Sequence, residues 1–263
     1  MCGKCGSAAT RALKAGAAAL AALAVGTPAV EADARATKRP HFMTRLSDAA
    51  PSVIQDMRYA GAYNFVGEPI EGYQAGVCWL HRDAARALAK AQERLLKDGY
   101  TLIVYDCYRP ARAVRLFNRW LNDSAAPKMR RVFHPDLDKK GVKRGRYIAA
   151  RSNHARGAAV DLALARVGYQ PRDVAEADPN IRCDAPFAER FPDTDLDFGT
   201  GYDCFSALSH TASRKISKEA QANRARLLRA MRSAGFSNYR REWWHFDYRG
   251  AELPNVQWDF PVR

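Results

Sequence analysis

Several features that define whole classes of proteins are missing from this sequence. It has no heptad pattern, no Gly-X-Y repeat and no solenoid period, which excludes coiled-coil, collagen-like and repeat architectures. Its longest nearly apolar stretch, residues 15–30, is rich in alanine and falls short of the roughly 20 apolar residues that cross a bilayer. The 263 residues, 47% of them hydrophobic and 27% charged, therefore predict a globular protein of one large or two small domains, not a polytopic membrane protein.

The N-terminus has the three parts of a secretory signal peptide. Basic residues precede an apolar run over 15–26, and small residues follow it. We predict a signal peptide over 1–32 and a secreted or periplasmic mature protein without a transmembrane span; an uncleaved anchor helix is the alternative. Residues 33–50 are polar and are expected to be loosely ordered, which leaves 51–263 as the functional domain.

The charge is strongly one-sided, with a formal net charge of +14. No zinc-finger spacing, aromatic RNA-binding signature or basic helix with heptads accompanies it, so we expect no nucleic-acid partner. We expect instead an attraction to anionic polymers of the cell envelope, which weakens as salt rises.

Four cysteines follow the predicted leader: Cys78, Cys107, Cys183 and Cys204. In an exported protein an even set predicts disulfides, and four cysteines allow three pairings. We favour Cys183 with Cys204, because that bond would close a loop rich in proline and aspartate, and then Cys78 with Cys107. A zinc-thiolate site is the competing interpretation, although no pair has the close spacing typical of such sites.

Hydrophobic periodicity predicts three helices and a few short strands. The helices are expected over 83–97, from Pro110 onward and over 218–234, and the strands over 100–105, 158–165 and within 236–248. Residues 122–151 and 168–206 are expected to be long loops. Because these elements interleave without regular alternation, we predict a single α+β domain with a small mixed or antiparallel sheet, flanking helices and a zinc site at the sheet.

Two short motifs carry the candidate chemistry. His154 and Asp161 lie seven residues apart around Gly157, and Glu242 stands three residues before His245. Two imidazoles and one carboxylate can hold one catalytic Zn²⁺ and leave a fourth position for water. Residues seven apart on an unbroken strand face opposite sides, so both reach one metal only if the chain turns at the glycine. A bend before the second histidine would likewise bring the glutamate beside the metal as a proton carrier.

The alternatives for these residues stay open at this point. A residue of any of these types, taken alone, more often has a structural role than a catalytic or metal-binding one. Asp161, for example, could cap a turn or pair with Arg156. Taken together, the four residues in two motifs favour a zinc hydrolase over a structural zinc site or a site without metal.

The motifs resemble those of the zinc D-alanyl-D-alanine peptidases. The first fills the pattern S-x-H-x-x-G-x-A-x-D from Ser152 to Asp161, and the second fills E-x-W-H from Glu242 to His245. Segments within 59–67, 106–110 and 259–262 are most similar to the D-Ala-D-Ala dipeptidases of the vancomycin-resistance type. The resemblance extends from about residue 52 to the C-terminus.

The resemblance implies roles for individual residues. The two histidines and Asp161 match the zinc ligands of that family, and Glu242 matches its catalytic acid/base. Arg109 matches the arginine that steadies negative charge on the tetrahedral intermediate; its alternative role is an ion pair with Asp106 at a helix start.

The substrate-binding residues are implied in the same way. Asp203 matches the residue that holds the free amino group of the substrate, and Ser152 and Tyr59 match positions that line the small pocket. Cys107 and Cys204 differ from the cytoplasmic resistance type and adjoin proposed functional residues, so a disulfide at either one could reshape the pocket.

Leader and resemblance together predict an exported zinc metallopeptidase that hydrolyses D-Ala-D-Ala by metal-activated water, with the small dipeptide as substrate. A D,D- or L,D-carboxypeptidase acting on peptidoglycan stem peptides is the nearest alternative, because the two zinc motifs do not separate these activities. A non-catalytic wall-binding module with structural zinc is the second, although Glu242 and Arg109 argue against it.

Overall fold

A computed structural model of the chain describes residues 1, 3, 37–250 and 254–263. The chain divides into two units, 1–32 and 33–263, and the elements below belong to the second. Apart from residues 1 and 3, the predicted signal peptide lies outside the described residues, so it stays a prediction. No helix in the described part of the chain is both long enough and apolar enough to cross a bilayer.

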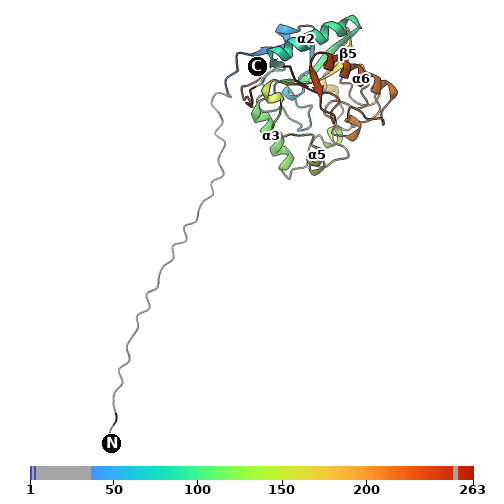
Figure 1. Ribbon diagram of the computed structural model, residues 1–263. Helices are drawn as coiled ribbons and strands as arrows, with labels where there is room; N and C mark the ends of the chain where they lie inside the picture. Colours follow the sequence, from blue (N-terminus) through green and yellow to red (C-terminus); the bar gives the residue numbers. More distant parts are fainter. Residues whose placement is uncertain (2, 4–36, 251–253) are drawn as a thin grey trace. The chain divides into compact units, whose positions relative to one another are not determined.

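A mixed five-stranded sheet forms the centre of this unit (Figure 1). In spatial order its strands are β2 (Ile54–Gln55), β4 (Tyr100–Asp106), β5 (Ala159–Arg166), β7 (His245–Tyr248) and β6 (Phe236–Asn238). β2 and β4 are parallel and the other neighbours are antiparallel. β4 and β5 are buried over nearly their whole length, as expected for central strands covered on both faces.

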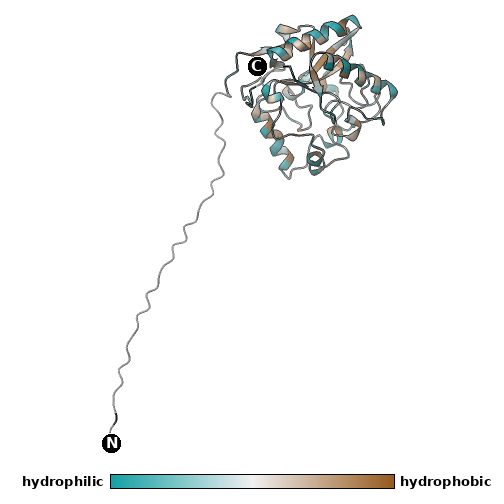
Figure 2. Ribbon diagram, in the orientation of Figure 1, coloured by the Kyte–Doolittle hydropathy of each residue, from teal (hydrophilic) through white to brown (hydrophobic). Residues whose placement is uncertain are grey.

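Two long helices, α2 (Arg82–Lys97) and α6 (Lys218–Ser233), pack with the sheet around one hydrophobic core. Both are striped in Figure 2, with hydrophobic and hydrophilic residues on different sides, which is the pattern that identified them in the sequence. The helix predicted after Pro110 is α3 (Ala111–Asn122). These three helices and the central strands confirm the predicted α+β fold class.

The segment 122–151 is not the continuous loop that we expected. It contains α4 (Arg130–Phe133) and α5 (Lys139–Gly145). Phe133 and Val142 are buried in a second apolar cluster, and the Asp138 side chain accepts a hydrogen bond from the Gly141 backbone N–H at 2.6 Å. A few buried side chains and one cap therefore order a segment whose composition is that of a loop.

The expectation of a loosely ordered segment over 33–50 is wrong for residues 43–49. β1 (Met43–Arg45) pairs with β3 (Trp79–His81) in a second, two-stranded sheet, and α1 (Leu46–Ala49) follows directly. The Leu46 side chain is fully buried. A three-residue strand and a four-residue helix are too short to give a periodic signal in the sequence.

Both predicted disulfides are present, Cys183–Cys204 and Cys78–Cys107. The first ties the expected long loop 168–206, whose one helical turn is η3 (Val174–Glu176). The short 3₁₀ turns η1 (Arg58–Ala60), η2 (His154–Arg156) and η4 (Ala207–Ser209) complete the described elements.

Candidate active site

Local backbone geometry brings the three candidate metal ligands together. His154 opens η2, and Gly157 at its end has φ +69°, so the chain turns there before it enters β5, as the spacing required. Asp161 is the third residue of β5, and its partner across the antiparallel pair is His245, the first residue of β7. Directly paired residues project from the same face of a sheet, which places both side chains beside the first histidine.

The ligand atoms of these residues converge. His154 Nε2 lies 3.3 Å from Asp161 Oδ1 and 3.1 Å from His245 Nδ1, and the last two atoms are 3.0 Å apart. On the outer side, His154 Nδ1 is 2.6 Å from the Cys107 carbonyl and His245 Nε2 is 3.3 Å from Asp247 Oδ1. A carbonyl only accepts, so Nδ1 of the first histidine donates and its inner nitrogen presents a lone pair.

This donor set fits zinc. Zinc bonds of about 2.0–2.2 Å at tetrahedral angles separate ligand atoms by about 3.4 Å, close to the observed spacings. Lone pairs that converge this closely repel one another unless a cation or a proton lies among them. Outer imidazole nitrogens bonded to a carbonyl and a carboxylate are the usual support of metal-binding histidines. Although burial opposes ionisation, the two histidines hold the pKa of Asp161 below its ordinary value.

Glu242 lies beside this group, at a bend of the backbone that precedes β7. Its N–H donates to the Tyr239 carbonyl at 3.0 Å, and its Oε2 lies 3.9 Å from His245 Nδ1. The side chain is buried, and burial raises its pKa to about 8, with Asp161 acting in the same direction and His245 opposing it. The bend that the sequence argument required is therefore present.

Arg109 forms the predicted ion pair and also lies beside the candidate metal ligands. Its Nε donates to Asp106 Oδ2 at 2.9 Å, which is the ion pair expected from the sequence alone. The same guanidinium lies 3.6 Å from Asp161 Oδ2 and over the ring of Tyr59, inside the cavity described below. The aspartate thus fixes the orientation of a cation beside the metal ligands.

The candidate substrate residues lie on the same cavity. Tyr59, in η1, donates a hydrogen bond to Asp203 Oδ2 at 2.6 Å. Asp203 has φ +56° and is 5% exposed; burial, followed by the charge of Asp161, raises its pKa to about 7. Ser152 Oγ accepts from the His154 backbone N–H at 3.2 Å, which helps to shape the turn that carries the ligand.

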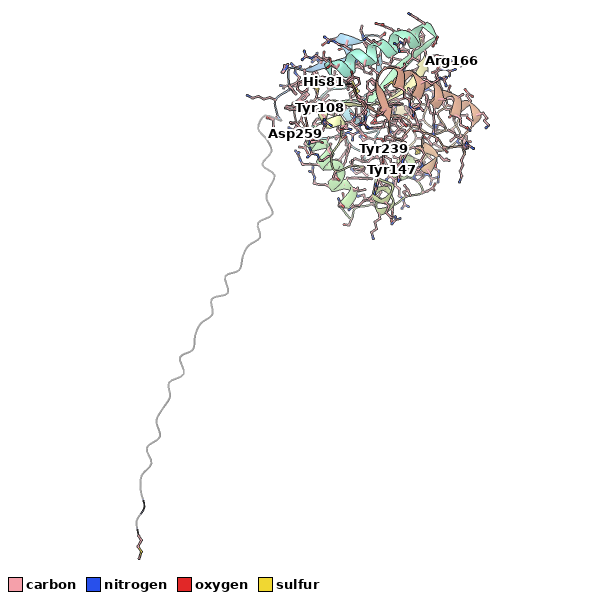
Figure 3. The ribbon with its side chains drawn as sticks, viewed as in Figure 1. His81, Tyr108, Tyr147, Arg166, Tyr239 and Asp259 are labelled. Atoms are coloured by element: carbon pink, nitrogen blue, oxygen red, sulfur yellow. A yellow bond between two sulfur atoms is a disulfide. The ribbon has the colours of Figure 1, made fainter. Side chains whose placement is uncertain are left out.

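One cavity of about 400 Å³ contains every predicted site residue. Its wall includes Tyr59, Arg109, Ser152, His154, Asp161, Asp203, Glu242 and His245. Phe65, Phe117 and Phe205 add an apolar wall, and Tyr147 and Tyr239, both labelled in Figure 3, line the cavity as well. A hollow that combines an apolar wall with convergent polar and charged groups is typical of a small-molecule site.

Most residues that hold these groups in place were not predicted from the sequence, and Asp106 was expected only as the ion-pair partner of Arg109. Asp106 binds Arg109 and also accepts from the Tyr73 hydroxyl at 2.6 Å. Tyr202 donates to Asp161 at 3.1 Å, and Asn153 donates to Asp247 at 3.0 Å. Of these residues only Asp247 could have been found from the sequence. It stands two residues after His245, and alternate residues of a strand share a face.

Comparison with known proteins decides the family. A family model described as D-ala-D-ala dipeptidase matches residues 39–173 and 193–263. A D-alanyl-D-alanine dipeptidase of Enterococcus faecium is 32% identical over 84% of this chain and 98% of that protein. The chain belongs to the D-Ala-D-Ala dipeptidase family. Membership of this family implies a peptidase.

Two further D-Ala-D-Ala dipeptidases are similar to the chain to nearly the same degree. The D-alanyl-D-alanine dipeptidases of Streptomyces coelicolor and Escherichia coli are each 31% identical, over 79% and 78% of this chain and 91% and 84% of their own lengths. Residues 174–192, which hold Cys183, fall outside the match to the dipeptidase family model.

Proposed function

We propose that the chain is a zinc-dependent D-Ala-D-Ala dipeptidase that is exported and acts in the cell envelope. The observation that carries the proposal is the single cavity in which two histidines and an aspartate converge beside a buried glutamate, an arginine and a second buried aspartate. The family supports the dipeptide as substrate. The N-terminal sequence pattern supports export.

His154, Asp161 and His245 would hold the zinc. Bound there, the ion would lower the pKa of a water molecule and polarise the peptide carbonyl. Glu242 accepts the proton of the attacking water and passes it to the leaving amine. The guanidinium of Arg109, fixed by its ion pair, stabilises the negative charge that develops on the carbonyl oxygen more in the transition state than in the ground state.

The buried Asp203 favours a free dipeptide over a stem peptide. Its carboxylate, held by Tyr59, pairs with the free ammonium group of D-Ala-D-Ala. In a stem peptide the same nitrogen is acylated and uncharged, so the carboxylate would be left buried without a cation.

Three measurements on the purified protein test the proposal. Metal analysis should find one zinc per chain, and hydrolysis of D-Ala-D-Ala should be lost with a chelator and return with zinc. The free dipeptide should be cleaved faster than a pentapeptide stem by a wide margin. Preference for the pentapeptide would make the enzyme a carboxypeptidase, and hydrolysis unaffected by metal removal would refute the zinc assignment.

Export is tested separately, in cells that express the whole chain. The mature protein should be found outside the cytoplasm, with its N-terminus near residue 33. A full-length protein in the cytoplasm would contradict this part of the proposal.

A further inference from the structure

A second hollow lies beside the active-site cavity and is lined by cations. It has a volume of about 530 Å³ and is lined by Ala207, Leu208, His210, residues 212–215 and the turn at Arg240 and Arg241. We call these residues the basic groove. Arg214 and Lys215 are among these residues, and no aspartate or glutamate of the described part of the chain lines the hollow.

The cations of the basic groove are not neutralised. In the part of the chain that the structure describes, Arg214, Lys215, Arg240 and Arg241 form no ion pair, and the last of these donates only to the Gly145 carbonyl, at 2.7 Å. Elsewhere in the described chain arginines do find carboxylates, such as Arg182 with Asp136 and Asp184. The groove therefore keeps an uncompensated positive potential.

The backbone of the groove is held from behind by another cation. The buried Arg224 of α6 donates to the carbonyls of Phe198, Leu208 and His210 at 2.7–2.9 Å, and its Nη2 has no partner among the described residues. The Thr211 N–H donates to the Arg240 carbonyl at 3.0 Å and joins the two walls. The groove is thus fixed in shape before any ligand arrives, which reduces the entropy lost on binding.

The groove borders the active-site cavity. The Tyr147 hydroxyl, which lines the cavity, lies 3.4 Å from Nε2 of His210, which lines the groove, and Arg241 directly precedes the candidate proton carrier. Burial, then the charges of Arg241 and Arg240, lower the pKa of His210, which is consistent with a positive potential at this wall.

We propose that the basic groove binds a phosphate-bearing polyanion beside the mouth of the active site. Several cations in one short groove call for a partner with closely spaced negative charges. Arginine forks pair with phosphate oxygens through two hydrogen bonds, and a phosphate polymer offers such oxygens at every repeat. Such binding would hold the enzyme on an anionic polymer while its catalytic cavity remains open to a small substrate.

The experiment uses fluorescently labelled inorganic polyphosphate as the probe, at physiological salt. In one variant Arg214, Lys215 and Arg240 are each replaced by Gln. The matched control carries Lys90→Gln, Lys97→Gln and Arg232→Gln, which removes the same charge from exposed positions on α2 and α6. We expect the groove variant to lose about tenfold or more in affinity, and the control less than about threefold.

Each outcome decides the proposal. Equal losses in both variants would show that net charge alone attracts the polymer, and absence of binding by the native protein would also refute the site. Poly-glutamate binding as tightly as polyphosphate would contradict the phosphate assignment. Unfolding curves check the fold; if the triple variant is unstable, Lys215→Gln alone must still weaken binding. Because binding is measured without catalysis, failure of the proposed hydrolysis leaves this result intact.

Discussion

The side chain of Glu242 is buried beside His245. Its Oε2 lies 3.9 Å from Nδ1 of that histidine, which is too far for a hydrogen bond. Glu242→Gln keeps the shape and removes the proton acceptor. We therefore expect kcat for D-Ala-D-Ala to fall by about 10²–10⁴-fold, with zinc content unchanged. Steady-state kinetics and metal analysis of the same sample test this, and a near-native rate would exclude the residue as the proton carrier.

Asp203 should control recognition of the amino group. For Asp203→Asn we expect kcat/KM for the free dipeptide to fall by about 10²-fold or more, because a buried charge partner of the ammonium is lost. Hydrolysis of N-acetyl-D-Ala-D-Ala, which has no such charge, should not fall in parallel. Tyr59→Phe removes only the hydrogen bond to the same carboxylate and serves as the milder control. Equal losses on both substrates would mean a structural role for the aspartate.

Among single residues, the sequence predicted which side chains line the cavity better than it predicted which residues support them. The eight residues identified from motifs all line one cavity. The carbonyl of Cys107, which fixes the His154 ring, could not be predicted because a backbone acceptor leaves no mark on residue type. Asp106 was expected only as an ion-pair partner, since its contact with Tyr73 joins positions 33 residues apart.

The turn between η2 and β5 depends on Gly157. A Cβ at this position would collide with the Met43 side chain and lie 3.1 Å from the His81 nitrogen, and φ +69° adds strain. We expect Gly157→Ala to lower the free energy of unfolding by about 2–4 kcal/mol, from strain plus overpacking, and to weaken zinc binding. Urea unfolding and a metal titration measure both.

Gly99→Ala is the matched control for that change. Gly99 has φ +79°, but an added Cβ there meets no atom within 4 Å. Gly99→Ala should lower the free energy of unfolding only by the backbone strain, about 1–2 kcal/mol, and leave zinc affinity unchanged. Equal zinc affinities in the two variants would disprove the dependence of the metal site on this turn.

The start of α6 should make stability depend on pH. Asp197 accepts hydrogen bonds from Arg190 at 2.5 Å, from the Gly199 N–H at 2.7 Å and from Ser217, the N-cap, at 3.0 Å. Burial opposes ionisation, but the Arg190 bond and these other donors hold the pKa of this carboxyl below its ordinary value. A depressed folded pKa stabilises above the unfolded value of about 3.9, and that stability is lost as pH falls through the folded pKa.

Asp197→Asn tests this linkage. At pH 7 we expect the variant to be less stable than the native protein by about 1–3 kcal/mol, and the difference should shrink at pH 3. Urea unfolding at the two pH values provides the comparison. A difference that does not change with pH would show that ionisation of this carboxyl is not what stabilises the segment.

The length of an element explains whether the sequence could predict it. α2 repeats its buried positions over sixteen residues, so its periodicity is clear. α4 has four residues and α5 seven, and each is ordered by burial against distant segments of the chain. β1 forms because β3 pairs with it, and pairing between segments so far apart has no local signature.

Over the whole molecule, each of the two disulfides adjoins a different residue of the candidate active site. Cys107 is bonded to Cys78, and its carbonyl accepts from His154, a candidate metal ligand. Cys204 is bonded to Cys183 and directly follows Asp203. Each bond closes a loop, of 29 and 21 residues in sequence separation, and should add about 3 kcal/mol of stability in the chain-entropy model.

Removing the bonds one at a time should therefore separate metal binding from substrate binding. Replacing Cys183 and Cys204 by Ala should raise KM for D-Ala-D-Ala while zinc affinity is kept, because the loop next to the amine-binding aspartate is released. Replacing Cys78 and Cys107 by Ala should weaken zinc binding with little change in KM of the zinc-saturated enzyme. KM and zinc affinity are measured below each variant's unfolding temperature, so that lost stability alone does not contribute. If both variants lost the same property, the disulfides would act on global stability and not on the two halves of the site.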